Sequence, residues 1–182
     1  EAIAELRAGI ERTQHLVERL LQLARLAPDA PQLRLQPVEL AVLVRDTVAR
    51  FSARAEAAGV DLGATSQAAP TVQGDPQQLA MLLDNLVENA LRHVPAGGRI
   101  DVASIRRGEL PGLTVTDNGP GIPADEKERV FDRFYRGEGA AGYGSGLGLA
   151  IVRSVAQRHA ATVTLGDAPG GGLQVTVLFP AG

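Results

Sequence analysis

The sequence of 182 residues contains no cysteine, and aromatic residues make up only 3% of it. The absence of cysteine excludes disulfides and metal sites built from thiolates. Low aromatic content disfavours base stacking on single strands, and a net charge of −3 offers no basic stripe, so no nucleic-acid partner is expected. No apolar run reaches the length of a membrane span and no signal peptide opens the chain, which predicts a soluble, cytoplasmic piece.

Glycine, in contrast, is abundant, with 21 residues, and part of it lies in the motif DNGPGI at 117–122. The apolar alternation before this motif predicts a buried strand that ends at Asp117. A carboxylate accepts hydrogen bonds but donates none, which suits the exocyclic amine of adenine. Gly119 and Gly121 would let the backbone approach a base and its ribose without a Cβ clash. An Asn-Gly turn between two strands would give the same pattern, so the motif alone leaves both interpretations open.

A second glycine motif, GYGSGLGLAI at 142–151, runs directly into an apolar helical pattern. Glycines before a helix expose backbone N–H groups at the positive end of the helix dipole, which predicts a cradle for a triphosphate. No Gly-Lys-Ser/Thr follows, so this is not a Walker A loop. A flexible glycine linker is the alternative, and the amphipathic helix that follows weakens it. The alternating glycines of the cradle are Gly142, Gly144, Gly146 and Gly148.

The motif NLVENALRH at 85–93 lies on a predicted helix whose leucines recur at helical spacing. A neighbouring face of that helix carries, at steps of three and four residues, Asn85, Glu88, Asn89 and Arg92. An asparagine oxygen is a hard ligand suited to Mg²⁺, and an arginine can bind a phosphate. Taken alone, the stripe is better explained as a solvated helix face with an ion pair between Glu88 and Arg92.

A fourth motif, VFDRFYR at 130–136, lies between the two glycine motifs. The segment 123–136 predicts a short helix with Pro123 near its start. Phe131 and Phe134 are expected to anchor this segment to the core. The glycine-rich stretch beyond it, GEGAAGYG, is expected to move, and we interpret the whole as a lid over a nucleotide.

In this order and spacing, the four motifs closely resemble the N box, G1 box, F box and G2 box of the catalytic and ATP-binding domain of bacterial sensor histidine kinases. The resemblance covers about residues 38–180, and the set of four is highly specific. It implies the ATP-binding fold shared with gyrase, MutL and the heat-shock chaperone. That fold is an α/β two-layer sandwich, in which helices cover one face of a mixed, mostly antiparallel sheet.

The resemblance also implies roles for single residues. Asn89 would coordinate Mg²⁺, Asn85 would support the metal and phosphates, and Asp117 would bind adenine. Asn85 and Glu88 are the catalytic candidates, although a base role for Glu88 has little support. The full set expected at the ATP site is Asn85, Asn89, Arg92, His93, Asp117, Gly119, Gly121, Ile122, Phe131, Phe134, Gly144, Ser145, Gly146, Leu147 and Gly148.

Residues 1–27 carry a heptad seam, and additional leucines widen it beyond a two-stranded zipper. A stripe that wide predicts a helix within a bundle. The helix is followed by a proline-containing linker at 28–37, and the catalytic domain would occupy 38–182. The segment resembles the second helix of the histidine kinase dimerisation hairpin, whose first helix carries the phosphoacceptor histidine. No phosphoacceptor motif occurs here, and His15, His93 and His159 lack its context, so the chain is interpreted as a fragment.

This resemblance implies a homodimer in the full-length protein, with a response regulator as a further partner and the bacterial inner membrane as its location. Two alternatives remain. One is a hydrolytic ATPase of the gyrase or MutL class, or a protein-serine kinase of the same fold, but those hydrolases place a glutamate where Asn85 stands. An asparagine cannot take a proton at neutral pH. The other is a non-catalytic nucleotide-binding or dimerisation module.

Periodicity predicts four long helices, at 1–26, 39–58, 75–93 and 146–159. It predicts strands at 60–65, 70–73, 99–107, 111–117, 162–166 and 172–179, the last two forming a hairpin around the Pro-Gly-Gly-Gly turn at 169–172.

Overall fold

The computed structural model describes residues 2–26, 32–137 and 145–181. Its elements, in chain order, are α1 (Ala2–Ala24), β1 (Gln36–Glu39), α2 (Leu40–Ala57), β2 (Asp61–Ser66), β3 (Thr71–Gly74), α3 (Pro76–His93), β4 (Arg99–Arg107), β5 (Leu110–Asp117), the 3-10 helix η1 (Arg129–Phe131), α4 (Gly148–Arg158), β6 (Thr162–Asp167) and β7 (Leu173–Leu178). The four long predicted helices and the six predicted strands are all present.

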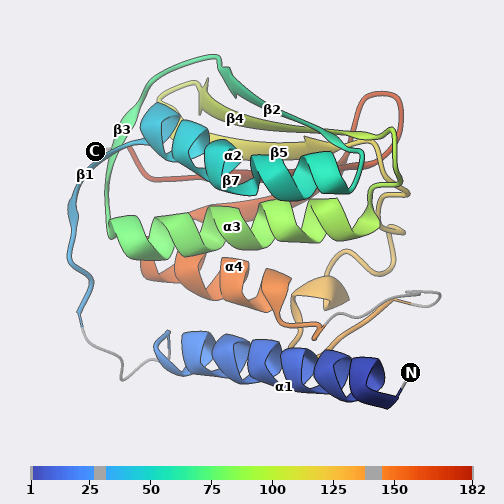
Figure 1. Cartoon of the computed structure of the whole chain (residues 1–182). Coiled ribbons are helices and arrows are strands. Elements are labelled where there is room, and N and C mark those ends of the chain that lie inside the picture. The colour runs from blue at the N-terminus through green and yellow to red at the C-terminus, as the bar shows by residue number, and fades with distance from the viewer. Residues whose placement is uncertain (1, 27–31, 138–144, 182) are drawn as a thin grey trace.

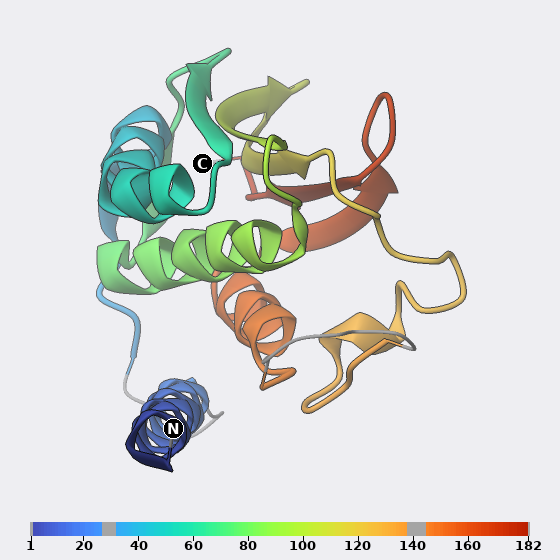
Figure 2. The ribbon, with the colours of Figure 1, turned by 45° about the vertical axis from the view of Figure 1, so that its right-hand side comes forward.

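The main sheet has five strands in the order β2-β4-β5-β7-β6. Only β2 and β4 pair in parallel, and the other neighbours are antiparallel. In this register Val115 stands beside Val102 on one side and Val175 on the other, so one face of the sheet is continuously apolar. Helices α2, α3 and α4 cover that face (Figures 1 and 2). The predicted two-layer α/β sandwich is therefore confirmed.

A second, two-stranded sheet pairs β1 with β3, with Val38 opposite Val72. The sequence did not predict β1, whose first two residues fall at the end of the expected linker. The strand has four residues, includes Pro37 and buries only Val38, so it carries no periodic signal of its own.

Helix α3 has a well-defined start. Asp75 is its N-cap, and the side-chain oxygen Oδ1 accepts hydrogen bonds from the backbone N–H groups of Gln77 and Gln78 at 3.0 and 3.2 Å. Pro76 follows at the first helical position, where no N–H is needed. The leucines at 79, 82, 83 and 86 are buried in the core, which fixes the rotation of the helix. This rotation places Asn85 near the start of α4 and Glu88 near arginines of α1 and α2.

A buried histidine fixes α4 relative to α3. The backbone N–H of Asp75 donates to Nε2 of His159 at 3.0 Å, and Nδ1 of His159 lies 2.8 Å from the carbonyl oxygen of Val155. Because Nε2 accepts, Nδ1 must carry the proton and donate. Burial lowers the pKa of His159, which favours the neutral ring that this arrangement requires.

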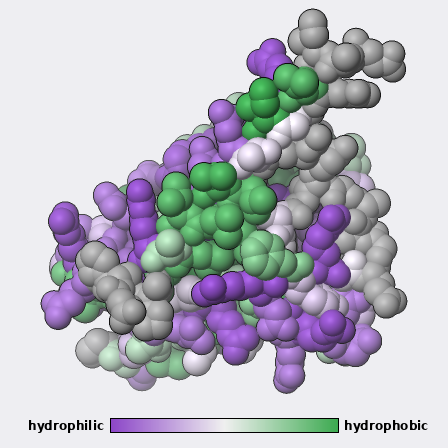
Figure 3. Space-filling model, turned by 90° about the horizontal axis from the view of Figure 1, so that it is seen from below, coloured by the Kyte–Doolittle hydropathy of each residue, from purple (hydrophilic) through white to green (hydrophobic). Residues whose placement is uncertain are grey.

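Helix α1 lies below α4 (Figure 1). Leu23 and, just after the helix, Leu26 are buried in the core cluster of the domain. Most of the heptad seam instead faces outward, and Figure 3 shows an apolar patch on this side of the molecule. Its exposed residues include Leu6, Ile10, Leu16, Val17, Leu20 and Leu21. Helix α1 therefore buries Leu23 against the domain and exposes a group of apolar side chains to the outside.

Candidate nucleotide site

The first part of the site is the end of strand β5, which delivers Asp117. The side chain is buried, with an exposed fraction of 7%. Its Oδ1 accepts hydrogen bonds from the backbone N–H groups of Gly119 at 2.9 Å and Leu173 at 3.3 Å. Leu173 begins β7, so two separate segments hold the carboxylate in one orientation. Within the described chain, no hydrogen bond or ion pair to Oδ2 is seen, which leaves this oxygen to accept from a ligand.

Close backbone packing surrounds this carboxylate. Gly172 has a φ of +104°, and a Cβ there would overlap the carbonyl oxygen of Asp117. Gly121 has a φ of +74°, and a Cβ on it would lie 3.1 Å from the carbonyl oxygen of Gly172. Glycine is needed at both positions because other residues rarely adopt such angles. The glycines of the G1 box therefore have a packing role within the protein in addition to the expected approach to a base. Ile122, the next residue, is half-buried against the core.

The polar stripe of α3 forms the second part. Asn85 is 4% exposed, and its Nδ2 donates to the carbonyl oxygen of Met81 at 2.7 Å. Its Oδ1 is buried and has no hydrogen-bond partner among the described residues. Asn89 lies one turn further along the same helix and is half-buried.

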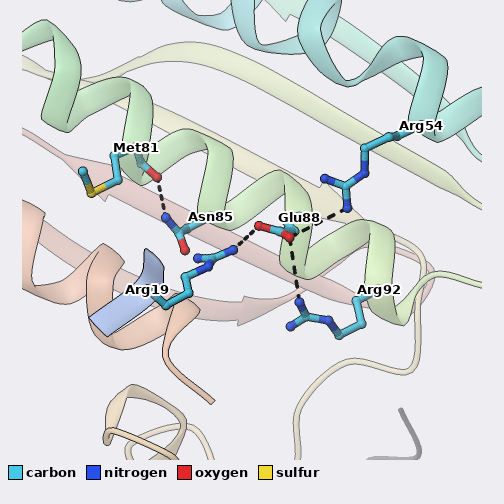
Figure 4. Close-up of polar contacts among 6 residues, drawn as sticks. All are labelled: Arg19, Arg54, Met81, Asn85, Glu88 and Arg92. Carbon is cyan, nitrogen blue, oxygen red and sulfur yellow. Dashed lines mark hydrogen bonds and ion pairs between the residues drawn. The ribbon is translucent and has the colours of Figure 1, made fainter. Parts of the chain in front are cut away.

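Three arginines from three helices converge on Glu88 (Figure 4). Arg19 of α1 forms a largely buried ion pair with it. Arg54 of α2 and Arg92 of α3 lie 3.8 and 4.0 Å from its other oxygen. The expected pair between Glu88 and Arg92 is thus present, but at the longest distance of the three. These four side chains sum to a formal charge of +2, which favours a polyanion at this end of the site.

The start of α4 forms the third part and meets α3 at Asn85. A Cβ on Gly148, the first residue of α4, would lie 3.6 Å from Oδ1 of Asn85. Leu147 before it is fully buried and anchors the helix start. Gly146 has a φ of +65°, and its carbonyl oxygen accepts from the N–H of Phe134 at 3.0 Å. The structure therefore brings the N box and the G2 box together, with half-buried Ser145 beside them. Gly144 and the lid residues 138–144 lie outside the described residues.

The two phenylalanines of the F box differ. Phe131 is half-buried against the core, as expected, and the guanidinium carbon of Arg153 lies 5.7 Å from the centre of its ring. The expectation that Phe134 anchors the segment is wrong, because its side chain is 59% exposed. Phe134 has a φ of +65° and contacts Gly146 through its backbone. The short helix expected in 123–136 is limited to the three residues of η1, preceded by turns.

His93 connects the two ends of the site. Partial burial lowers its pKa, the neighbouring Arg92 guanidinium lowers it further, and Asp117 opposes this effect. A Cβ on Gly119 would lie 3.3 Å from the carbonyl oxygen of His93. The last turn of α3 thus lies against the G1 box, while its middle lies against the G2 box.

The sequence interpretation missed Arg19, Arg54 and Gly172. Arg19 had a weak signal, because it interrupts an apolar row formed by Leu16, Leu23 and Leu26 at steps of three and four residues. Arg54 lies on the polar face of α2 with no distinguishing pattern, and Gly172 stands in a turn of three glycines that all look equivalent in the sequence.

Residues 74–182 match the family described as histidine kinase-, DNA gyrase B-, and HSP90-like ATPase. The chain belongs to this family. It is therefore an ATP-binding domain, and the fold and family expected from the four boxes are confirmed.

Two curated proteins illustrate its relatives. The chain is 38% identical over 174 residues to the sensor protein kinase PmrB of Pseudomonas aeruginosa, a match that covers 94% of the chain and 36% of PmrB. It is 34% identical over 183 residues to the signal transduction histidine-protein kinase BaeS of Escherichia coli, covering 99% of the chain and 39% of BaeS. The chain thus spans less than two fifths of the length of these relatives.

Solved structures are also similar to this chain, among them that of a sensor histidine kinase. Full-length ShkA in complex with AMPPNP is similar with a TM-score of 0.85 at 28% identity, covering 98% of this chain and 38% of ShkA. The mycobacterial sensor histidine kinase MprB is similar with a TM-score of 0.71 at 30% identity, covering 80% of this chain and 97% of MprB. None of the helices in the described part of the chain is long and apolar enough to cross a membrane.

Proposed function

We propose that this chain is the ATP-binding catalytic part of a sensor histidine kinase. It transfers the γ-phosphoryl group of ATP to a histidine on a dimerisation hairpin, for relay to an aspartate of a response regulator. The observation that carries the proposal is the unpartnered, buried Oδ1 of Asn85, which lies at the start of α4 beside a cluster with a formal charge of +2. A buried acceptor without a partner is rare and costly in a protein, which favours a ligand at this point.

The nucleotide would span the two ends of the site. Asp117 would accept from the adenine amine through Oδ2, and Gly119, Gly121 and Ile122 would border the base. The phosphates would lie toward the start of α4, where Gly146, Leu147 and Gly148 expose backbone N–H groups. Arg92 would contact a phosphate, and His93, held neutral by its surroundings, would lie between base and phosphates.

The family implies Mg²⁺, and the side chains at this end fit it. The described residues contain no cluster of three or more His, Cys, Asp or Glu side chains for a metal. Asn89, supported by Asn85, would instead offer an amide oxygen, a hard ligand that Mg²⁺ accepts together with phosphate oxygens and water. When bound, the metal would neutralise charge on the phosphates.

Neither Asn85 nor Glu88 is suited to activate water as a base, which favours transfer to histidine over hydrolysis. Asn85 cannot take a proton. Glu88 is engaged by arginines from three helices, so we assign it to holding these cations around the phosphates rather than to activating water.

The outward seam of α1 supports the partner assignment. Its exposed apolar residues resemble one face of a bundle helix that lacks its neighbours. We assign this face to the first helix of the hairpin and to the hairpin of a second copy, which makes the full-length protein a homodimer. We further assign the full-length protein to the bacterial inner membrane with this part in the cytoplasm, as the resemblance to bacterial sensor histidine kinases implies.

The test is phosphotransfer from γ-labelled ATP. The chain is extended upstream with a hairpin helix that carries an acceptor histidine, and acid-labile label is measured in the presence of Mg²⁺. We expect label on the extended protein, none on the chain alone, and none when the acceptor histidine is replaced by glutamine. Transfer should be slower with the hairpin supplied as a separate molecule, because tethering raises its effective concentration. Fast ATP turnover without any acceptor would instead favour the hydrolase alternative.

A further inference from the structure

Arg19 is the only charged residue that α1 buries among those whose side chains are described. Its exposed fraction is 6%, similar to that of the apolar Leu23 on the same helix, which is 5% exposed. A buried guanidinium must be paired to be tolerated, because removing a charge from water is costly. Arg19 is paired on one side only: Nη2 forms the ion pair with Glu88, while Nη1 is buried and has no hydrogen-bond partner in the described part of the chain.

The unpartnered nitrogen points into the site. Nη1 lies 3.9 Å from the position that a Cβ would take on Gly148, the first residue of α4. The unpartnered Oδ1 of Asn85 lies 3.6 Å from the same position. Figure 4 shows the Arg19 guanidinium between Asn85 and Glu88. A buried donor on α1 and a buried acceptor on α3, neither with a partner among the described residues, therefore flank the start of α4. Of the two, only the donor, Nη1 of Arg19, can bind an anion.

The chemistry of this point favours an anion with several acceptor oxygens. The start of an 11-residue helix contributes a partial positive charge, and a guanidinium contributes donors in a fixed plane that matches phosphate. We propose that Arg19 binds the terminal phosphate of a nucleoside triphosphate, so that the dimerisation helix supplies one ligand of the nucleotide site. This assignment rests on the proposed function.

The terminal phosphate is assigned because of where α1 lies. Asp117, at the end of β5, would hold the base, and the phosphates would run from there toward Gly148 at the start of α4. Helix α1 lies beyond α4 on the side away from the sheet (Figure 1). An arginine from α1 therefore meets the far end of the phosphate chain. A diphosphate would leave Nη1 without its partner, so Arg19 should make the site distinguish a triphosphate from a diphosphate.

Calorimetry with Mg²⁺ and either ADP or the non-hydrolysable analogue AMPPNP tests this. In Arg19→Ala we expect affinity for AMPPNP to fall about tenfold or more, the effect of losing a hydrogen bond to a charged group, while ADP affinity is unchanged. Unchanged ADP binding also shows that the variant is folded. Arg19→Lys keeps the charge without the planar fork and should recover part of the loss. The matched control is Arg25→Ala, an exposed arginine just after the same helix, which should bind both nucleotides like the parent.

Equal or tighter binding of AMPPNP by Arg19→Ala, with ADP unchanged, would overturn the assignment. Tighter binding would mean that the ion pair with Glu88 blocks the phosphate end. An equal loss of ADP and AMPPNP affinity would also overturn the assignment, because this result would mean that Arg19 acts through packing and does not bind the terminal phosphate. A parent chain that binds neither nucleotide would refute the proposed function itself, and the two failures are thus distinguishable.

Discussion

The two ends of the candidate site are built in different ways. At the adenine end, Asp117 is fixed by two backbone N–H groups, and glycines pack backbone against backbone around it. At the phosphate end, long side chains from α1, α2 and α3 meet, and two buried polar atoms have no partner among the described residues. Backbone contacts leave little freedom, whereas side chains can rearrange. The end proposed to bind adenine is therefore preformed without a ligand, whereas the end proposed to bind phosphate has polar atoms that a ligand would satisfy.

The largest expected effect comes from disturbing the preformed end. Gly172→Ala would force a positive φ on alanine and overlap the carbonyl oxygen of Asp117. Backbone strain and overpacking together should lower the free energy of unfolding by roughly 3–5 kcal/mol. The control is Gly170→Ala in the same turn, where φ is +88° and nothing lies within 4 Å of the added Cβ. It should cost about 1–2 kcal/mol from strain alone. Urea denaturation measures both, and equal losses would show that the contact with Asp117 has no importance.

Asp117→Asn tests the same end without disturbing its packing. The amide keeps an oxygen for the N–H groups of Gly119 and Leu173 but loses the negative acceptor for adenine. ADP affinity should fall by about 1.5–3 kcal/mol, the range for a hydrogen bond to a charged group. Calorimetry with ADP and GDP provides the measurement, and the preference of the parent for ADP should be reduced. Unchanged ADP affinity, or equal affinity of the parent for ADP and GDP, would remove the role assigned to Asp117.

Asn89→Ala tests the phosphate end and leaves the adenine contacts in place. Nucleotide binding should weaken by about tenfold, and only in the part that depends on Mg²⁺. Replacing a residue that merely hydrogen-bonds a metal ligand already lowers metal affinity about tenfold or more, so losing a ligand itself should cost at least that much. The measurement is ADP binding with Mg²⁺ and with a chelator. If magnesium enhances binding equally in the variant and the parent, Asn89 is not a metal ligand.

The same contrast governs what the sequence could predict. The boundaries of the long helices and the predicted strands are correct to within two residues, because each carries a strong periodic pattern. The position of Asp117 at the end of a buried strand could be predicted because that strand and the glycines after it are adjacent in the chain. The backbone donor Leu173 is 56 residues away, and no local pattern reveals it.

The phosphate end was predicted only in part, because its partners come from distant helices. Arg19 and Glu88 are 69 residues apart, and no local sequence pattern around either residue indicates that the two form an ion pair. Phe134 was predicted to be buried because phenylalanine is apolar. In the structure its side chain is exposed and its backbone has a positive φ, which residues other than glycine rarely adopt. Local periodicity therefore predicts elements, while contacts between elements require the fold.

The smallest expected effect concerns the contact through which His159 connects helices α3 and α4. His159 joins the end of α4 to the start of α3, away from Asn85 and Gly148, and burial lowers its pKa. In the unfolded chain its pKa returns to about 6.5, so the unfolded state takes up protons first as the pH falls. The contribution of His159 to stability should thus be complete above that pH and lost as the pH falls through the lower pKa of the folded state.

Urea denaturation at about pH 5.5 and pH 7.5, on either side of the ordinary histidine value, measures the difference. His159→Asn should reduce this difference more than His93→Asn, because the ring of His159 is held by two hydrogen bonds and its residue is buried, whereas His93 is exposed. If His159→Asn leaves the pH dependence of the parent unchanged, the neutral ring does not contribute to holding α3 and α4 together.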